Sequence, residues 1–166
     1  CSNSGTISGT YAGGIVGSHM AYKFQDGDNF IINCSNTGTI SGTGAGGIIG
    51  GYAFYDSEAN CKCYIGTSSS GDDYGCSNTG DIRATGAGGI CGTYLNYQGE
   101  ADLEISYNTN SGEVGYGSSG SDGTSREVGG IIGSYGCYRQ SSSSIVNIHL
   151  NGNSGAISST GNGGIC

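Results

Sequence analysis

The stretch CSNTGTISGT (residues 34–43) and its continuation GAGGIIG (residues 44–50) decide how this chain folds. The same phrase opens the chain and returns at residues 76–92, and more divergent copies follow later. Internal repetition of this kind indicates an array in which each unit packs on its neighbours. We therefore divide the 166 residues into five repeats, the last of them incomplete. The repeats are residues 1–33, 34–75, 76–107, 108–150 and 151–166.

Three positions recur in every repeat: an asparagine third, a glycine fifth and an aliphatic residue seventh. Positions that alternate in this way have the period of a β-strand and not that of a helix. Asparagines in equivalent positions predict an internal amide ladder, which we interpret as structural. The asparagines are Asn3, Asn36, Asn78, Asn110 and Asn153, and the aliphatic residues are Ile7, Ile40, Ile82, Val114 and Ile157.

Two further apolar features complete each repeat. The Gly-Gly-Ile phrase supplies a second aliphatic column, and a third apolar strand precedes the next repeat, as in residues 30–32. One such unit cannot bury its apolar face alone, whereas stacked units shield one another. The pattern predicts an all-β fold, a β-solenoid (β-helix) of about five stacked repeats. Each repeat has about 33 residues, with loop insertions in the second and fourth.

These phrases resemble the GLUG-motif repeats of bacterial surface and adhesin-like proteins. The resemblance is carried by Gly13-Gly14-Ile15-Val16-Gly17 and its copies, joined to phrases such as Asn36 to Ile40. It covers nearly the whole chain, and it implies a β-solenoid displayed outside the cell. The cysteines and the tyrosines of this chain depart from the pattern.

Composition narrows the classes of function. The formal net charge is −8 with only five Lys and Arg residues, which argues against nucleic acid, since its binding needs cations to neutralise phosphates. No apolar run approaches the roughly 20 residues that span a bilayer. No signal peptide is visible and the first residue is not Met, so we expect a mature or excised piece.

Eight cysteines in so acidic a chain favour an oxidising compartment and disulfides. Equivalent Cα atoms in neighbouring strands lie about 4.8 Å apart, so a Cys1–Cys34 bond is geometrically possible, although buried free thiols fit the same pattern. We interpret the loop residues Cys61, Cys63 and Cys137 as forming disulfides between loops. No zinc-type spacing is present, and we expect no metal and no other cofactor. The disulfide candidates are Cys1, Cys34, Cys61, Cys63, Cys76, Cys91, Cys137 and Cys166.

Aromatic residues follow the Gly-Gly-Ile phrase at two fixed distances, four and seven residues beyond its isoleucine. The first set contains His19, which we interpret as a substitute for tyrosine, with Tyr52, Tyr94 and Tyr135. The second set is a candidate binding surface for glycans or a protein partner if its rings are exposed and coplanar. Buried rings would instead indicate a structural role. The members of the second set are Tyr22, Tyr55, Tyr97 and Tyr138.

Possible catalytic and modified residues are few. Asp81 and Glu113 share a repeat position, and such a pair could perform acid–base chemistry in a polysaccharide-degrading β-helix, but Arg83 offers simple charge compensation. His149 is interpreted as a surface residue. Turn chemistry accounts for the Asp-rich segments at residues 26–29 and 72–73 better than calcium binding does. Asn33 fits the acceptor pattern for N-glycosylation.

We therefore expect a structural, extracellular repeat segment of a cell-surface or filament-forming protein, without catalysis. The alternatives are an adhesin module that binds a glycan or a partner through its tyrosines and, less favoured, a polysaccharide-degrading enzyme. Natural arrays need polar capping units, and neither end of this chain resembles one. The repeats would then either continue a longer array or associate head-to-tail.

Overall fold

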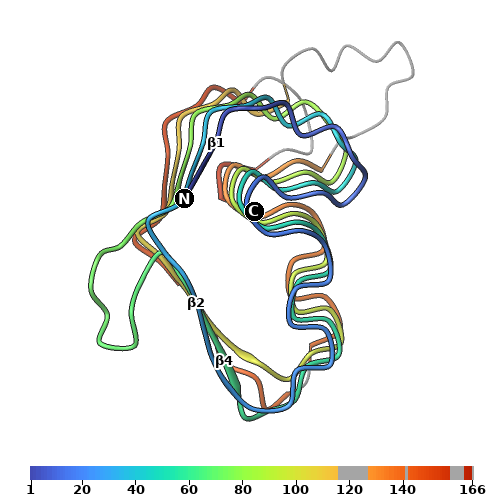
Figure 1. Cartoon of the computed structure of the whole chain (residues 1–166), viewed down its shortest axis with the longest axis vertical. Coiled ribbons are helices and arrows are strands. Elements are labelled where there is room, and N and C mark those ends of the chain that lie inside the picture. The colour runs from blue at the N-terminus through green and yellow to red at the C-terminus, as the bar shows by residue number, and fades with distance from the viewer. Residues whose placement is uncertain (116–126, 141, 158–162, 166) are drawn as a thin grey trace.

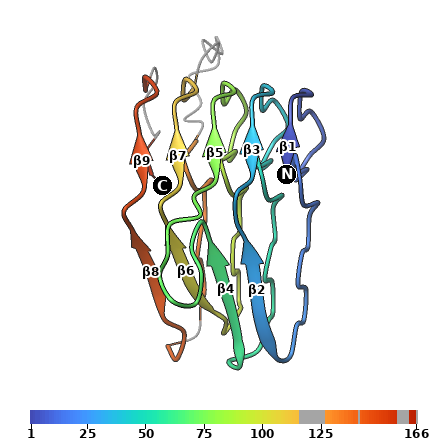
Figure 2. The same ribbon diagram turned by 60° about the vertical axis from the view of Figure 1, so that its left-hand side comes forward.

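The computed structural model describes residues 1–115, 127–140, 142–157 and 163–165. These residues form nine β-strands and no helix, and the strands make two parallel sheets (Figures 1 and 2). The first sheet has the order β1-β3-β5-β7-β9 and the second the order β2-β4-β6-β8. The first contains β1 (Ser2–Asn3), β3 (Ser35–Asn36), β5 (Ser77–Asn78), β7 (Thr109–Asn110) and β9 (Gly152–Asn153). The second contains β2 (Gly27–Ile31), β4 (Cys61–Ile65), β6 (Asp102–Ser106) and β8 (Val146–His149).

Each strand pairs in parallel with the equivalent strand of the next repeat. Asn3 lies opposite Asn36, and Asn36 lies opposite Asn78. Outside the named strands, single parallel bridges join further equivalent residues, such as Ile40 to Ile82 and Gly46 to Gly88. The predicted register of like residue against like residue is therefore present, and Figure 2 shows the equivalent strands side by side.

The predicted closed β-solenoid is wrong. The described residues form two separate parallel sheets with strands of two to five residues, and no third continuous sheet closes the cross-section. Between the sheets the repeats meet only through single bridges, turns and irregular segments. Because the strands are short, most of the described residues lie outside regular β-structure. The alternating pattern of the sequence therefore overestimated the strand content.

The backbone explains why no strand forms between the Gly-Gly-Ile phrase and the second sheet. After the Gly-Gly-Ile phrase comes a turn segment that we call the aromatic arm. At every second position of each arm a non-glycine residue has φ between 52° and 60°, a left-handed conformation that strands do not adopt. The arms still bond to one another, since the Tyr52 amide donates to the carbonyl of Thr93. The arms are residues 18–23, 51–56, 93–98 and 134–139.

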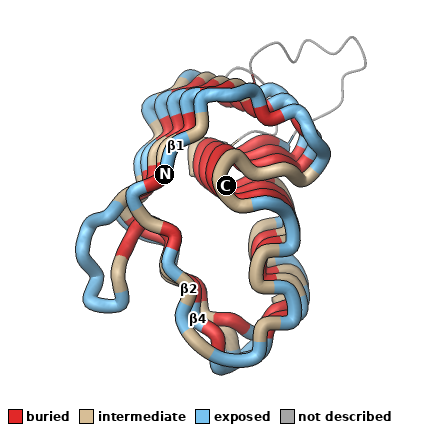
Figure 3. Tube along the Cα trace, viewed as in Figure 1, coloured by how far each residue is buried: buried red, intermediate tan, exposed pale blue. Residues whose placement is uncertain are grey.

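The core consists of columns of equivalent aliphatic side chains from the inner repeats. In Figure 3 the buried segments of successive repeats, in red, lie one behind another. Ile40, Ile82 and Val114 are fully buried in one cluster, and a second, larger cluster contains Ile48 and Ile90. Burial of each such side chain contributes roughly 1.5–3 kcal/mol relative to exposure. The columns therefore hold neighbouring repeats together by apolar contact as well as by hydrogen bonds.

The insertion of the second repeat forms a small hairpin beside the second sheet. It leaves β4, and Thr67 and Asp73 form an antiparallel bridge across it. In Figure 1 it is the green loop that projects beyond the strands. The insertion expected at residues 118–126 lies outside the described residues.

Candidate functional site

The arms arrange the aromatic side chains in two parallel columns. We name them the His19 column (His19, Tyr52, Tyr94 and Tyr135) and the Tyr22 column (Tyr22, Tyr55, Tyr97 and Tyr138). Because each arm repeats the same left-handed turns, equivalent rings project in the same direction from successive repeats. Sequence analysis predicted the membership of both columns, and the ring geometry confirms it.

Rings within a column lie nearly parallel to one another. In the His19 column the centroid distances are 4.7–5.1 Å, and the interplanar angle between Tyr52 and Tyr94 is 16°. In the Tyr22 column the distances are 5.4, 5.5 and 5.9 Å, with angles of 6°, 9° and 11°. Between the columns the contacts are edge-to-face, as for Tyr94 and Tyr97 at 5.2 Å. Both arrangements are favourable for aromatic pairs.

The exposure of the rings decides between the two interpretations of the Tyr22 column. Tyr22 and Tyr138 are about half exposed, at 48% and 47%, whereas Tyr55 and Tyr97 are half-buried. The rings are stacked and not coplanar, so the faces between neighbours are covered and mainly the edges meet solvent. A sugar ring stacks on an open aromatic face. The column therefore lacks the coplanar platform that glycan recognition would use.

Polar contacts surround the rings. The Tyr55 hydroxyl donates to the side-chain oxygen of Gln98 at 3.1 Å. The ammonium group of Lys23 lies 5.5 Å from the ring centroid of Tyr22, and Arg139 lies over Tyr138 in the same way. Such cation–π contacts contribute roughly 0.5–1 kcal/mol at exposed sites.

The two columns differ in electrostatic environment. Burial, assisted by the phenol of Tyr11, raises the pKa of Tyr52 to about 12. Burial also raises the pKa of Tyr94, with smaller contributions from neighbouring tyrosines. These two phenols of the His19 column are therefore protonated at neutral pH.

The asparagine column forms the amide ladder that the sequence predicts. The Nδ2 atom of Asn36 donates to Oδ1 of Asn78 at 2.7 Å and to the carbonyl of Gly38 at 2.7 Å. The same pair of bonds recurs at Asn78. Asn36, Asn78 and Asn110 are buried, and buried polar groups are costly unless they are paired. The ladder holds neighbouring repeats together, as expected of a structural element.

The predicted disulfides are not formed in this structure, because all seven described cysteines are free thiols. The strand register explains the absence of disulfides at β4. Cys61 lies opposite Gly27, and Cys63 lies between Asn29 and Leu103, so neither faces another cysteine along the sheet. Cys166 lies outside the described residues. The alternative of buried thiols therefore describes five of the seven, namely Cys34, Cys61, Cys63, Cys76 and Cys91.

Burial favours the neutral form of the Cys63, Cys76 and Cys91 thiols. Cys76 donates to the carbonyl oxygen of Ile31, and burial raises the pKa of this thiol to about 12. Burial also raises the pKa of Cys63 and Cys91. Thiolates are the nucleophilic and metal-binding form of cysteine. Among the described residues, no group of three or more His, Cys, Asp or Glu side chains could hold a metal ion.

Asp81 and Glu113 are neighbours, as predicted, but Asp81 is already paired. Its carboxylate accepts a hydrogen bond from Arg83 Nη2 at 2.7 Å and a longer one, 3.3 Å, from the Glu113 backbone amide. This is the charge compensation that the sequence suggested. An exposed ion pair of this kind contributes roughly 0–1 kcal/mol.

Asn33, the candidate for N-glycosylation, is exposed in the turn between β2 and β3, with φ of 51°. Its glycosylation stays a prediction.

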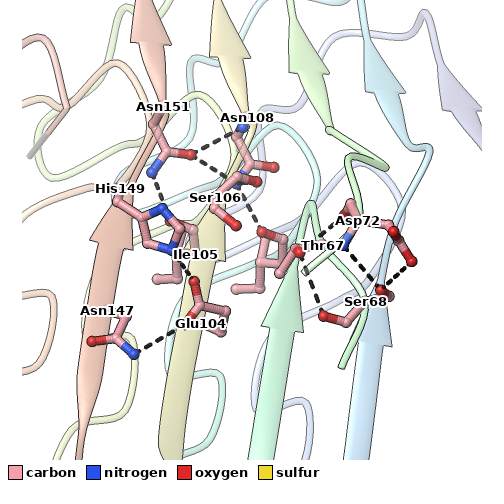
Figure 4. Close-up of polar contacts among 11 residues, drawn as sticks. Thr67, Ser68, Asp72, Glu104, Ile105, Ser106, Asn108, Asn147, His149 and Asn151 are labelled. Carbon is pink, nitrogen blue, oxygen red and sulfur yellow. Dashed lines mark hydrogen bonds and ion pairs between the residues drawn. The ribbon is translucent and has the colours of Figure 1, made fainter. Parts of the chain in front are cut away.

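A polar cluster on the second sheet was not predicted (Figure 4). Glu104 accepts from Asn147 Nδ2 at 3.0 Å and makes a short contact with His149 Nε2. Beside it the hairpin is closed by Asp72, whose carboxylate accepts from Ser68 and Ser70. The two groups border a shallow pocket of about 410 Å³. The register of β6 and β8 pairs Glu104 with Asn147, and His149 lies two residues further along the same face of β8.

Comparison with protein-family models, with curated proteins and with solved structures found no match to this chain. The resemblance to GLUG-motif repeats therefore stays a hypothesis. No helix within the described residues is long and apolar enough to cross a membrane.

Proposed function

We propose that this chain is a structural, non-catalytic segment of a cell-surface or filament-forming protein outside the cell, and that its edge repeats pack end to end on further repeats, which either continue a longer array or belong to another copy of the chain. The observation that carries the proposal is the exposure of core columns at the edge formed by β8 and β9. Ile157 is 49% exposed, although its pairing partner Val114 is fully buried. Ile148 in β8 is 37% exposed, although its partner Ile105 is fully buried.

The opposite edge, formed by β1 and β2, differs in this respect. Ile7 and Ile31, which occupy the same columns as Ile157 and Ile148, are only 6% and 5% exposed. A repeat that packed on the β8–β9 edge would cover Ile148 and Ile157 as inner repeats cover their equivalents. Unpaired parallel edges are also templates for pairing with another chain.

The amide ladder gives the association a direction. The Nδ2 atom of each of the first four asparagines donates to Oδ1 of the asparagine in the next repeat, from Asn3 to the acceptor Asn153. The β1 edge therefore presents the acceptor Oδ1 of Asn3, and the β9 edge presents the donor Nδ2 of Asn153. Acceptor and donor are complementary, which favours head-to-tail contact, and a head-to-tail contact that does not close into a ring produces a filament.

Sedimentation velocity over a range of concentrations, with electron microscopy of the same samples, tests the proposal. We expect concentration-dependent linear assembly and an axial spacing of about 4.8 Å in fibre diffraction. Ile157→Lys places a charge on the exposed end column and should leave a folded monomer. Tyr74→Lys changes an exposed side chain away from this column and should assemble normally. A wild-type chain that stays monomeric at every concentration would overturn association between copies and leave the longer array, and assembly that tolerates Ile157→Lys would overturn the role of the β8–β9 edge.

The two alternative functions have less support. Glycan recognition through the Tyr22 column is disfavoured because the ring faces are covered by their neighbours. Polysaccharide cleavage at Asp81 and Glu113 is disfavoured because Arg83 already compensates the Asp81 carboxylate. Binding of a polysaccharide that Tyr138→Ala abolishes would favour the first alternative. Hydrolysis that both Asp81→Asn and Glu113→Gln abolish would favour the second.

A further inference from the structure

The Tyr22 column places four phenol side chains in one row along the surface of the molecule. Neighbouring ring centroids are 5.4, 5.5 and 5.9 Å apart, and the rings come from four successive repeats. The ends of the row are about half exposed and its middle is half-buried, so an oxidant in solution reaches the ring edges. Assembly of the chain does not require phenols in a row, because phenylalanines would stack equally well.

We propose that the Tyr22 column is a site of oxidative cross-linking, in which tyrosines of adjacent repeats are joined as dityrosine. The co-reactant is hydrogen peroxide acting through a haem peroxidase. The product is a covalent bond between repeats of one chain, added to the hydrogen bonds and apolar contacts that already join them.

The chemistry balances as follows for Tyr55 and Tyr97. Each phenol loses one electron to the oxidised peroxidase and its hydroxyl proton to water, which gives two phenoxyl radicals. A carbon–carbon bond forms between ring carbons ortho to the two oxygens. The two ring hydrogens at that bond then leave as protons while the oxygens are reprotonated, which restores both phenols. The net reaction consumes two tyrosines and one hydrogen peroxide, and it yields one dityrosine and two waters.

Geometry favours coupling within the column over coupling between molecules. The partner ring is held next to the radical, and pre-positioning of this kind is equivalent to a very high local concentration. The ring must rotate to bring the two ortho carbons together, and the exposed edges of the column leave room for that movement. Outside the two columns, no described phenols form such a row: Tyr11 meets Tyr52 edge to face, and Tyr64 stacks on Phe30, which has no hydroxyl.

The His19 column is a less suitable substrate. It contains one histidine, so it offers two pairs of adjacent phenols where the Tyr22 column offers three. Burial raises the pKa of Tyr52 and Tyr94, so these phenols lose a proton less readily. We therefore assign the links to the Tyr22 column.

The experiment treats the folded, full-length chain with a haem peroxidase and hydrogen peroxide at low protein concentration. Dityrosine fluorescence reports the product, intact mass reports a loss of two hydrogens per link, and peptide mapping locates each link. We expect monomers on a denaturing gel, with links that join Tyr22 to Tyr55, Tyr55 to Tyr97 or Tyr97 to Tyr138. The melting temperature of the treated chain should rise, because a cross-link restricts the unfolded chain.

Matched variants separate this site from general tyrosine oxidation. Tyr55→Phe combined with Tyr97→Phe keeps the stacked rings but leaves no adjacent phenols in the column, and it should lose the dityrosine signal. Tyr74→Phe combined with Tyr107→Phe removes two phenols outside the columns and should keep it. The inference is overturned if the urea-unfolded chain gives an equal yield of dityrosine. It is also overturned if the links map to the His19 column or to other tyrosines, or if links form only between molecules. These outcomes do not depend on end-to-end assembly, because the monomer is the substrate.

Discussion

The side-chain nitrogen of Asn36 lies 2.7 Å from the side-chain oxygen of Asn78, and that of Asn78 lies 2.6 Å from the oxygen of Asn110. The central amide therefore both donates and accepts within a buried row. Its removal leaves the Asn36 donor and the Asn110 acceptor each short of a partner. A buried polar group without a partner costs roughly 1–3 kcal/mol.

We predict that Asn78→Ala lowers the free energy of unfolding by about 3–5 kcal/mol. The variant loses the side-chain hydrogen bonds of Asn78 and leaves Asn36 and Asn110 each without a partner on that side. Asn3→Ala is the matched control, because Asn3 is at the end of the row and partly exposed. It should cost about 1–2 kcal/mol, because the two hydrogen bonds of Asn3, to Gly5 and Asn36, are partly exposed to water. Urea unfolding followed by circular dichroism measures both. Equal losses in the two variants would contradict a cooperative internal ladder.

The glycine that ends the Gly-Gly-Ile phrase offers a second matched pair. A Cβ atom built on Gly50 would lie 2.3 Å from the carbonyl oxygen of Tyr11, whereas one built on Gly17 would meet nothing within 4 Å. Gly50→Ala forces backbone apart and should cost at least about 3 kcal/mol, in the range of severe overpacking. Gly17→Ala should change stability by less than about 1 kcal/mol. Thermal unfolding of the two variants makes the comparison, and a tolerated Gly50→Ala would show that the repeats pack less closely.

Part of this architecture could be predicted because its register depends on side-chain identity. Repeated asparagines and isoleucines indicate which residues meet, and Asn36 does pair with Asn78 and Ile40 with Ile82. The β-solenoid was predicted wrongly, because strand content depends on backbone conformation, which the side-chain pattern does not reveal. The arms carry residues such as Tyr52, Phe54 and Asp56 at positive φ, where glycine or asparagine would have been the recognisable signal.

Disulfide formation could not be predicted from the repeat positions of the cysteines either. Equivalent positions bring Cys34 and Cys76 together in neighbouring repeats, and Cys34 contributes, after burial, to the raised pKa of Cys76, yet both remain free thiols. Cys34 donates to the carbonyl of Ile32, and Cys76 donates to that of Ile31. The contact between Glu104 and His149 was missed for a related reason, since it joins residues at different repeat positions.

Left-handed backbone in the arms leads to a third prediction, at the exposed residue Asp56, where φ is 54°. Asp56→Asn and Asp56→Val both remove the exposed ion pair with Lys23. Asparagine tolerates the left-handed region, whereas a β-branched side chain does not. We expect Asp56→Asn to be neutral within about 0.5 kcal/mol and Asp56→Val to cost about 1–2 kcal/mol. Equal unfolding free energies would mean that the turn relaxes to another conformation.

The buried thiol of Cys76 makes a final prediction about alkaline pH. Its pKa is raised from 9.0 to about 12, chiefly by burial, so the folded chain keeps a proton that the unfolded chain loses above about pH 9. The unfolded state then binds fewer protons, and stability must fall as pH rises. The contribution is fully present below about pH 9 and is lost between about pH 9 and 12. A shift of about three units corresponds to roughly 4 kcal/mol. Urea unfolding at about pH 8, 9.5 and 11 should show this decline, and Cys76→Ala, although less stable at neutral pH, should show a shallower one. The same decline in both proteins would mean that Cys76 is not protected from solvent.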